Sequence, residues 1–283
     1  MLISAKEIIN KSLELFRRDI RIWISYLVVS VVSALLGLIF AFNPTVLLFF
    51  STLGISSFVV LMVCMLFLLG ITVFNIWFNI ALVRTIHKRL FNQPALTMKQ
   101  EFAEVKHLLP RTIGISFVVA LIVFLPLGIS IVGATFTGFE DILLGNFKGV
   151  TLLYLFFGLL GIYGIFHLIY FSLKYVFSYY LVTLEEKQIR ESLHQGQALV
   201  KERMGEIFWR LFAPLVLFLL MYVFANYIFT ALSDYIGGMV ISIFANFLSL
   251  IVSAFVALLS VIALVILFED AKTKAVGTSV KKG

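Results

Sequence analysis

Six long runs without charged residues alternate along the chain with shorter polar segments rich in Lys and Arg. A helix that crosses about 30 Å of hydrocarbon needs about 20 apolar residues, and each run reaches that length. The runs therefore predict an all-α integral membrane protein in which residues 1–283 form a single transmembrane domain, with residues 269–283 as a flexible cytoplasmic tail. The six predicted transmembrane helices lie at 22–42, within 45–83, at 112–137, at 149 and into the aromatic stretch 170–180, at 211–232 and within 239–268.

The second run, 45–83, is longer than a single span requires. A helix over the whole run would be about 58 Å long, nearly twice the hydrocarbon thickness. Dividing it into two spans would place the basic N-terminus and the basic segment 84–111 on opposite sides of the membrane, which the positive-inside rule disfavours. We therefore expect six spans, and the run is either one long helix or contains an extra interfacial segment.

The basic residues are distributed unequally among the polar segments. Of the 22 Lys and Arg residues, 21 lie on one predicted side, and Lys148 alone lies on the other. Because Lys and Arg near span ends stay on the cytoplasmic side, we expect both termini in the cytoplasm and the protein in the bacterial inner membrane. The same rule accounts for the formal net charge of +7. We expect no nucleic-acid partner.

The composition supports the membrane class and excludes several others. Apolar residues make up 61% of the chain and charged residues 13%, and the mean hydropathy is +1.08. These values exclude intrinsic disorder, a disulfide scaffold and a nucleic-acid-binding domain.

Trp23, Trp77 and Trp209 fall near the cytoplasmic span ends, where the sequence predicts an interfacial aromatic belt.

A polar helix with apolar residues at i, i+4, i+7 and i+11 is predicted before the first, third and fifth spans. Capping-box patterns open the three copies at Ser4, Thr97 and Thr183. The chain is thus interpreted as three repeats, 4–83, 97–180 and 183–268, each an interfacial amphipathic helix followed by a transmembrane hairpin. Alternatively, any cytoplasmic segment between hairpins shows such periodicity. The copies start 89 and 91 residues apart, and their apolar positions are Ile9, Leu13, Phe16 and Ile20; Met98, Phe102, Val105 and Leu109; and Ile189, Leu193, Gly196 and Val200.

The sequence contains no pattern of known catalytic, metal or cofactor chemistry. It has no phosphate-binding Gly-rich loop, no HExxH and no GxSxG. The paired carboxylates, such as Glu269 and Asp270, are adjacent in loops or at span ends and are interpreted as solvated surface. We therefore expect a protein that is not an enzyme, without catalytic residues, metal or cofactor.

Polar residues inside spans are functional candidates because they are costly there. His167 is the ionisable residue that lies well inside a span, and Asn75 and Asn79 share one helical face at i, i+4. The two asparagines either line a polar pathway or make hydrogen bonds between helices.

The basic residues Arg17, Arg18 and Arg21 are candidates for contacts with lipid headgroups. They lie mainly off the apolar face of the first polar helix. Such a helix can lie at the headgroup boundary with its bases toward anionic lipid, each contributing about 1 kcal/mol. Alternatively, these residues only fix the orientation during insertion.

Six spans with basic amphipathic entries such as EIINKSLELFRRDIRIW and IRESLHQGQALVKERMGEIFWRLF resemble the bacterial YciC-like membrane proteins. The pattern is also similar to the membrane domain that precedes the catalytic barrel in some glycerophosphoryl diester phosphodiesterases. The resemblance covers most of the chain. It implies a fold and no active site, because the chemistry of those phosphodiesterases belongs to a separate soluble barrel.

Two functions fit these patterns. We favour a non-enzymatic multi-pass membrane protein that acts through membrane lipids, anionic ones included, or through a membrane protein partner at the cytoplasmic leaflet. The alternative is a transporter or exporter of an apolar or lipid-like small molecule. A transporter should contain a polar cavity near mid-membrane, whereas a scaffold should have a packed core.

Overall fold

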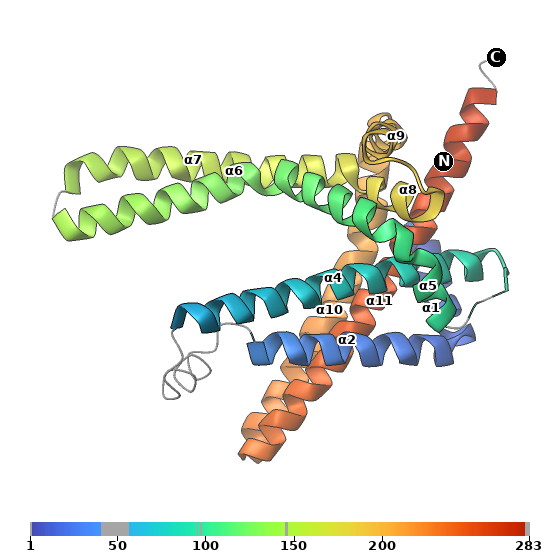
Figure 1. Cartoon of the computed structure of the whole chain (residues 1–283), viewed down its shortest axis with the longest axis horizontal. Coiled ribbons are helices and arrows are strands. Elements are labelled where there is room, and N and C mark those ends of the chain that lie inside the picture. Colours follow the sequence, from blue (N-terminus) through green and yellow to red (C-terminus); the bar gives the residue numbers. More distant parts are fainter. Residues whose placement is uncertain (1, 41–56, 95, 97, 145–146, 281–283) are drawn as a thin grey trace. The chain divides into compact units, whose positions relative to one another are not determined.

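The computed structural model describes residues 2–40, 57–94, 96, 98–144 and 147–280, and no strand occurs among them (Figure 1). The all-α class is therefore confirmed. The elements are α1 (Ala5–Arg18), α2 (Ile20–Phe40), α4 (Ser57–Leu90), α5 (Met98–Val105), the 3-10 turn η1 (Lys106–Leu108), α6 (Leu109–Leu144), α7 (Phe147–Tyr175), α8 (Ser178–Glu185), α9 (Ile189–Lys201), α10 (Met204–Ile236) and α11 (Met239–Val280).

Within the described residues, five helical stretches are long and apolar enough to cross a membrane, and they fit a multi-pass membrane protein. α2 contributes a shorter apolar segment, Trp23–Leu35, and residues 41–56 after it lie outside the described residues. The sixth span therefore stays a prediction. The five stretches are Met62–Leu90, Lys99–Thr135, Phe156–Glu185, Met204–Ile236 and Ile241–Ala275.

Two helices differ in length from the predicted spans. α4 is one continuous helix of 34 residues, and the first part of the run 45–83 lies outside the described residues. α11 continues as a helix through Val280, where the sequence suggested a tail from residue 269. Lys274 Nζ lies 2.6 Å from Asp270 Oδ1, one turn earlier, and such i, i+4 pairs favour the helical conformation.

The chain divides into two compact units, Met1–Leu109 with Phe208–Gly283, and Pro110–Ile207. In the first unit, α2, α4 and α11 pack against one another, α1 packs on α11, and α5 packs on α4. Trp23 and Phe268 are among its largest fully buried side chains. The three helices α2, α4 and α11 therefore form the core of this unit.

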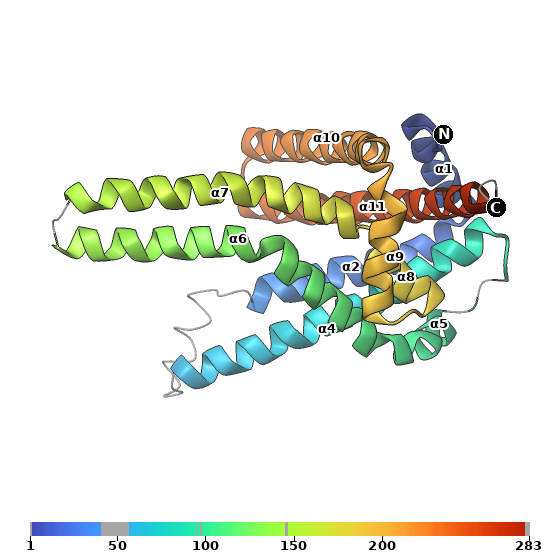
Figure 2. The ribbon, with the colours of Figure 1, turned by 90° about the horizontal axis from the view of Figure 1, so that it is seen from above.

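In the second unit, α6 and α7 run side by side in both ribbon views (Figures 1 and 2). A glycine lets the two helices approach closely, because a Cβ atom on Gly164 of α7 would lie 3.0 Å from the backbone of Leu127 on α6. The short helix α9 packs on α7 and α8. Its Gly196 lies against Ser178, whose Oγ would be 2.4 Å from an added Cβ.

The first polar helix begins as predicted but buries a slightly different face. Ser4 is the N-cap of α1, and the Glu7 backbone N–H donates to its Oγ at 3.2 Å. The buried positions are Ile8, Ser12 and Leu15, each one residue before a predicted apolar position. The predicted positions Ile9, Leu13 and Phe16 are half-buried, and Ile20 is 50% exposed.

The predicted aromatic belt does not hold for Trp23. This side chain is fully buried, and its Nε1 donates to the carbonyl oxygen of Leu15 at 3.2 Å. Trp77 is half-buried and donates to the carbonyl of Phe102 at 3.1 Å, whereas Trp209 is 65% exposed. The indole N–H groups of the first two thus bind the ends of short helices, because a buried indole needs an acceptor.

Candidate functional site: a polar cavity among three helices

A cavity of about 340 Å³ lies between α2, α4 and α11 in the first unit. Ser30 and Asn75, which line it, lie near the midpoints of α2 and α4. Part of the wall is deeply buried, since Tyr26 is 3% and Ser33 7% exposed. The polar side chains of the lining are those of Tyr26, Ser30, Ser33, Asn75 and Asn79, and α11 contributes apolar residues. The structure therefore brings Asn75 and Asn79 to one polar cavity between these three helices.

Two of the polar lining groups are bonded within the protein. The Tyr26 hydroxyl lies 3.0 Å from Thr85 Oγ1, and Thr85 donates to the carbonyl of Ala81 at 2.8 Å. Asn79 Nδ2 donates at 2.9 Å to the backbone carbonyl of Asn75 in the same helix. The Nδ2 group of Asn79 thus donates within α4.

Three other polar groups are available to a bound molecule. Among the described residues, no hydrogen bond engages the side chains of Ser30, Ser33 or Asn75. A carboxamide offers two donors and an acceptor, and a hydroxyl offers one donor and two acceptor lone pairs. No charged side chain belongs to the lining. The uncharged groups of the site can thus both donate hydrogen bonds to a bound molecule and accept hydrogen bonds from it.

An apolar groove of about 570 Å³ adjoins this cavity between α2 and α4. Ser33 and Ile71 line both the cavity and the groove. The outer residues of the groove are exposed, with Val32 at 48% and Leu66 at 64%. The polar cavity is therefore continuous with an apolar surface of the first unit.

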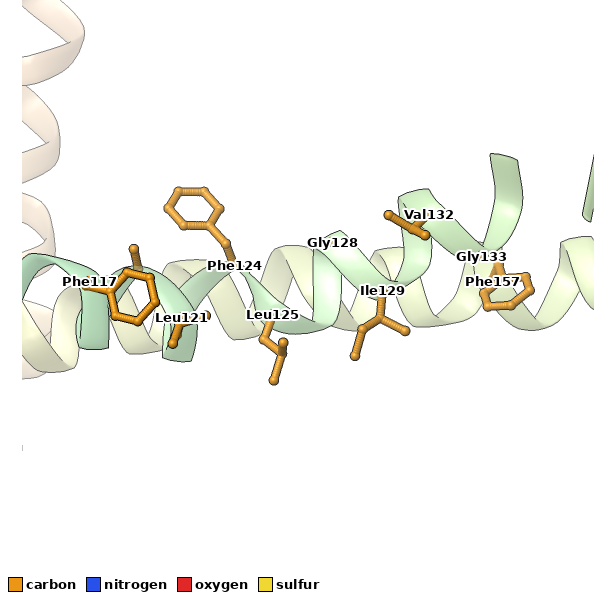
Figure 3. Close-up of a pocket in the computed structure, with 10 residues that line it drawn as sticks. Phe117, Leu121, Phe124, Leu125, Gly128, Ile129, Val132, Gly133 and Phe157 are labelled. Carbon is orange, nitrogen blue, oxygen red and sulfur yellow. The ribbon is translucent and has the colours of Figure 1, made fainter. Parts of the chain in front are cut away.

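An open groove of about 650 Å³ runs along α6 in the second unit. Figure 3 shows Phe117, Leu121, Leu125 and Ile129 following one another along the helix, with Phe157 of α7 beside Gly133. The lining carries no polar side chain, and its larger residues on α6 are about half exposed. Such a surface suits lipid chains and offers no group that could orient a ligand.

His167 belongs to the second unit, and its side chain has a partner there. Its Nε2 lies 3.2 Å from the backbone carbonyl oxygen of Ile122 on α6. Pro126, four residues later, has no N–H with which to bond that carbonyl. The imidazole N–H therefore satisfies an acceptor that the proline leaves free. Sequence reasoning identified the histidine but missed this partner.

The three candidate headgroup residues differ in their surroundings. Arg17 is exposed on α1. Arg18 donates to Asn92 Oδ1 at 3.2 Å and to the carbonyl of Arg89 at 2.7 Å, so its guanidinium is bonded to the end of α4 and to the loop after it. Arg21 lies at the start of α2, and its side chain is outside the described part of the structure. Arg17 and Arg18 are thus both exposed, and they differ in that the Arg18 guanidinium is hydrogen-bonded.

The carboxylates of Glu269 and Asp270 are not the solvated surface that the sequence suggested. Glu269 Oε1 lies 3.0 Å from His87 Nε2, and both side chains are largely buried. Asp270 Oδ2 accepts from the backbone N–H of Ile3 at 2.7 Å, and Arg210 Nε donates to the carbonyl of Ile3 at 2.6 Å. These contacts join residues more than 180 positions apart, and no local pattern reveals them.

A second buried charge joins α4 and α5. The Glu101 side chain is 1% exposed, and its Oε1 lies 2.9 Å from Lys88 Nζ. Lys88 also lies 3.1 Å from Glu104 Oε2. Among the described residues, no three His, Cys, Asp or Glu residues are grouped as ligands for a metal ion.

Comparison with protein-family models, with curated proteins and with solved structures finds no match for this chain.

Proposed function

We propose that this chain is a multi-pass membrane protein that holds a lipid-like amphipathic molecule in the cavity between α2, α4 and α11 and moves it within or across the bilayer. The observation that carries the proposal is that, within the described part of the chain, no hydrogen bond engages the side chains of Ser30, Ser33 and Asn75 in that cavity. Of the two functions compatible with the sequence, transport or export of a lipid-like molecule therefore has the more specific support.

The energetic argument concerns polar groups in an apolar region. An unsatisfied polar group in the hydrocarbon core costs several kcal/mol, so these side chains need a partner. The cavity of about 340 Å³ has the volume of roughly ten waters, at about 30 Å³ each, and lies at the small end of ligand pockets. Water and the polar end of a ligand are the two candidate occupants, and the apolar groove beside the cavity favours an amphipathic ligand.

The proposal is tested by purifying the protein from native membranes and identifying the retained small molecules by mass spectrometry. Asn75→Leu removes the carboxamide and fills part of the cavity. Asn226→Leu is the matched control, because Asn226 lies on α10 and donates to the carbonyl of Tyr222 in its own helix. We expect one amphipathic species to be retained by the wild type and by Asn226→Leu, and to be lost from Asn75→Leu. Identical profiles in all three proteins contradict the proposal.

The three predicted repeats are part of the proposed architecture. The helix pairings support them: α5 packs on α4, α9 packs on α7, and α1 packs on α11, so each short helix lies on a hairpin helix of another repeat. Ser12, Glu101 and Ser192, which are 89 and 91 residues apart, are all buried.

We propose six spans with both termini in the cytoplasm of a bacterial inner membrane, as the distribution of basic residues indicates. The likeness to YciC-like proteins and the absence of enzymatic activity also stay proposals.

A second function, attraction of anionic lipid by α1, is favoured by one observation. Arg17 is exposed beside an open hollow of about 640 Å³ on α1, which Arg18 and Glu14 also line. Arg17→Gln should lower the retention of anionic lipid in purified protein. Arg18→Gln should leave it unchanged, because Arg18 is bonded to Asn92 and Arg89. Equal effects of the two substitutions contradict this role.

A further inference from the structure

We propose that the occupant of the cavity is an uncharged lipid with a hydroxyl or carbonyl head and an aliphatic chain, and that it enters from the bilayer through the groove between α2 and α4. The inference rests on the proposed function, because it specifies what the cavity holds and how the molecule reaches it. The two hollows adjoin, because Ser33 and Ile71 line both, and the inference places the head of the molecule in the cavity and its chain in the groove.

The lining of the cavity determines the charge of the head. Its polar groups are hydroxyls and carboxamides, and none of its lining residues is charged. A charged head would lose its hydration there without gaining an opposite charge, which costs several kcal/mol. A hydroxyl or carbonyl head needs only the neutral donors and acceptors that Ser30, Ser33 and Asn75 supply.

The groove determines the position of the chain. On α4 it extends from Leu66 to Phe74, about 12 Å along the helix, which is less than half of the hydrocarbon thickness. The polar residues Asn75 and Asn79 lie closer to the basic end of α4, at Arg84–Arg89, than the groove does. The molecule is therefore oriented like a lipid of the leaflet at that end, with its head toward the basic residues and its chain toward the bilayer centre.

Gly70 keeps the groove open. A Cβ atom at this position would meet no other atom within 4 Å. Gly70 lines the groove, so the absence of a side chain there leaves the groove open. A larger side chain can fill this space without clashing with the protein. Gly70→Leu therefore blocks the groove while the fold is kept. Gly158→Leu is the matched control, because a Cβ on this glycine of α7 also meets open space and Gly158 does not line the groove.

The test is photolabelling of the protein reconstituted in phosphatidylcholine vesicles. The probe is a monoacylglycerol with a diazirine in its chain and an alkyne tag, and the comparison probe is the fatty acid with the same chain. We expect the monoacylglycerol to label residues 66–74 saturably, with at least fivefold less labelling in Gly70→Leu and in Asn75→Leu, and a change below twofold in Gly158→Leu. We expect the fatty acid to label this segment at least fivefold less. Melting temperatures of the variants verify that they fold.

The outcomes separate the inference from the proposed function. Labelling that is lost in Asn75→Leu and kept in Gly70→Leu overturns entry through the groove and leaves the cavity as the binding site. Equal labelling by the fatty acid overturns the uncharged head. Labelling that does not saturate, or that neither substitution changes, overturns the proposed function together with the inference.

Discussion

His167 Nε2 lies 3.2 Å from the carbonyl oxygen of Ile122, across the pair of helices α6 and α7. A carbonyl in a helix normally accepts from the N–H four residues later, and at that position α6 has Pro126. The histidine therefore supplies the donor that the proline lacks. An ionisable residue inside a span, which is usually a functional candidate, has a structural role here.

This role predicts that His167 and Pro126 are energetically coupled. In Pro126→Ala, the new N–H can bond the Ile122 carbonyl within α6, so loss of the histidine should then cost less. We expect His167→Phe to be about 1 kcal/mol less costly in the Pro126→Ala background than in the wild type. Reversible unfolding in mixed micelles measures the double-mutant cycle. Among the described residues Nδ1 has no hydrogen-bond partner, so the effect of its removal should be the same in both backgrounds and cancel in the cycle. Additive effects of the two substitutions contradict this account.

The contact between α8 and α9 predicts a strong effect of one methyl group. In Gly196→Ala, the Cβ would lie 2.4 Å from Ser178 Oγ and 3.1 Å from its backbone nitrogen. Overpacking of this kind costs about 1–3 kcal/mol, and we expect the free energy of unfolding to fall by that amount. Gly205→Ala is the control, because its Cβ meets open space within α10. It should stabilise the protein by up to about 1 kcal/mol, since Ala is the better helix former. A similar loss in both variants is incompatible with the contact.

The ion pair between Lys88 and Glu101 predicts a large loss when one partner is removed. Lys88→Met leaves the buried Glu101 carboxylate without its cation, which costs about 3–5 kcal/mol. The double variant Lys88→Met with Glu101→Leu should recover most of this loss, because no charge stays buried. Lys11→Met is the control, since Lys11 and Glu7 form an exposed pair worth at most about 1 kcal/mol. Thermal unfolding of the wild type and the three variants measures these losses of stability. Equal losses in Lys88→Met and Lys11→Met would show that the buried ion pair contributes no more to stability than the exposed one.

The proposed topology is tested by labelling single cysteines in intact cells, in a Cys64→Ala background. Asp141→Cys and Asp234→Cys should react with an impermeant thiol reagent from outside, and Glu191→Cys should react only after permeabilisation. The reason is that 21 of the 22 basic residues fall on the side of Glu191. Protection at Asp234 combined with labelling at Glu191 contradicts the orientation.

Local sequence patterns predicted those features of the structure that depend on residues close to one another in the sequence. Runs of apolar residues indicated the long helices, and the capping-box pattern identified Ser4, whose Oγ accepts from Glu7. The i, i+4 spacing placed Asn75 and Asn79 on one face, and both line the cavity.

Other parts of the site depend on packing that the sequence does not reveal. Ser30 and Ser33 are small hydroxyl residues within an apolar run, where such residues are common at helix contacts, so no local signal marks them as cavity residues. The carboxylate of Asp270 gains its partner, the N–H of Ile3, only when α1 packs on α11. A prediction from sequence periodicity does not extend to such pairs, because their partners are distant along the chain.

The central claim is that the cavity between α2, α4 and α11 binds an amphipathic molecule, and the most direct measurement is an experimental structure of the protein in native-lipid nanodiscs. The account predicts non-protein density in the cavity, with its polar end within hydrogen-bond distance of Ser33 or Asn75 and its chain in the groove beside Gly70. The contrary result is a cavity that holds water alone, or one closed by a hydrogen bond from the Asn75 carboxamide to another helix.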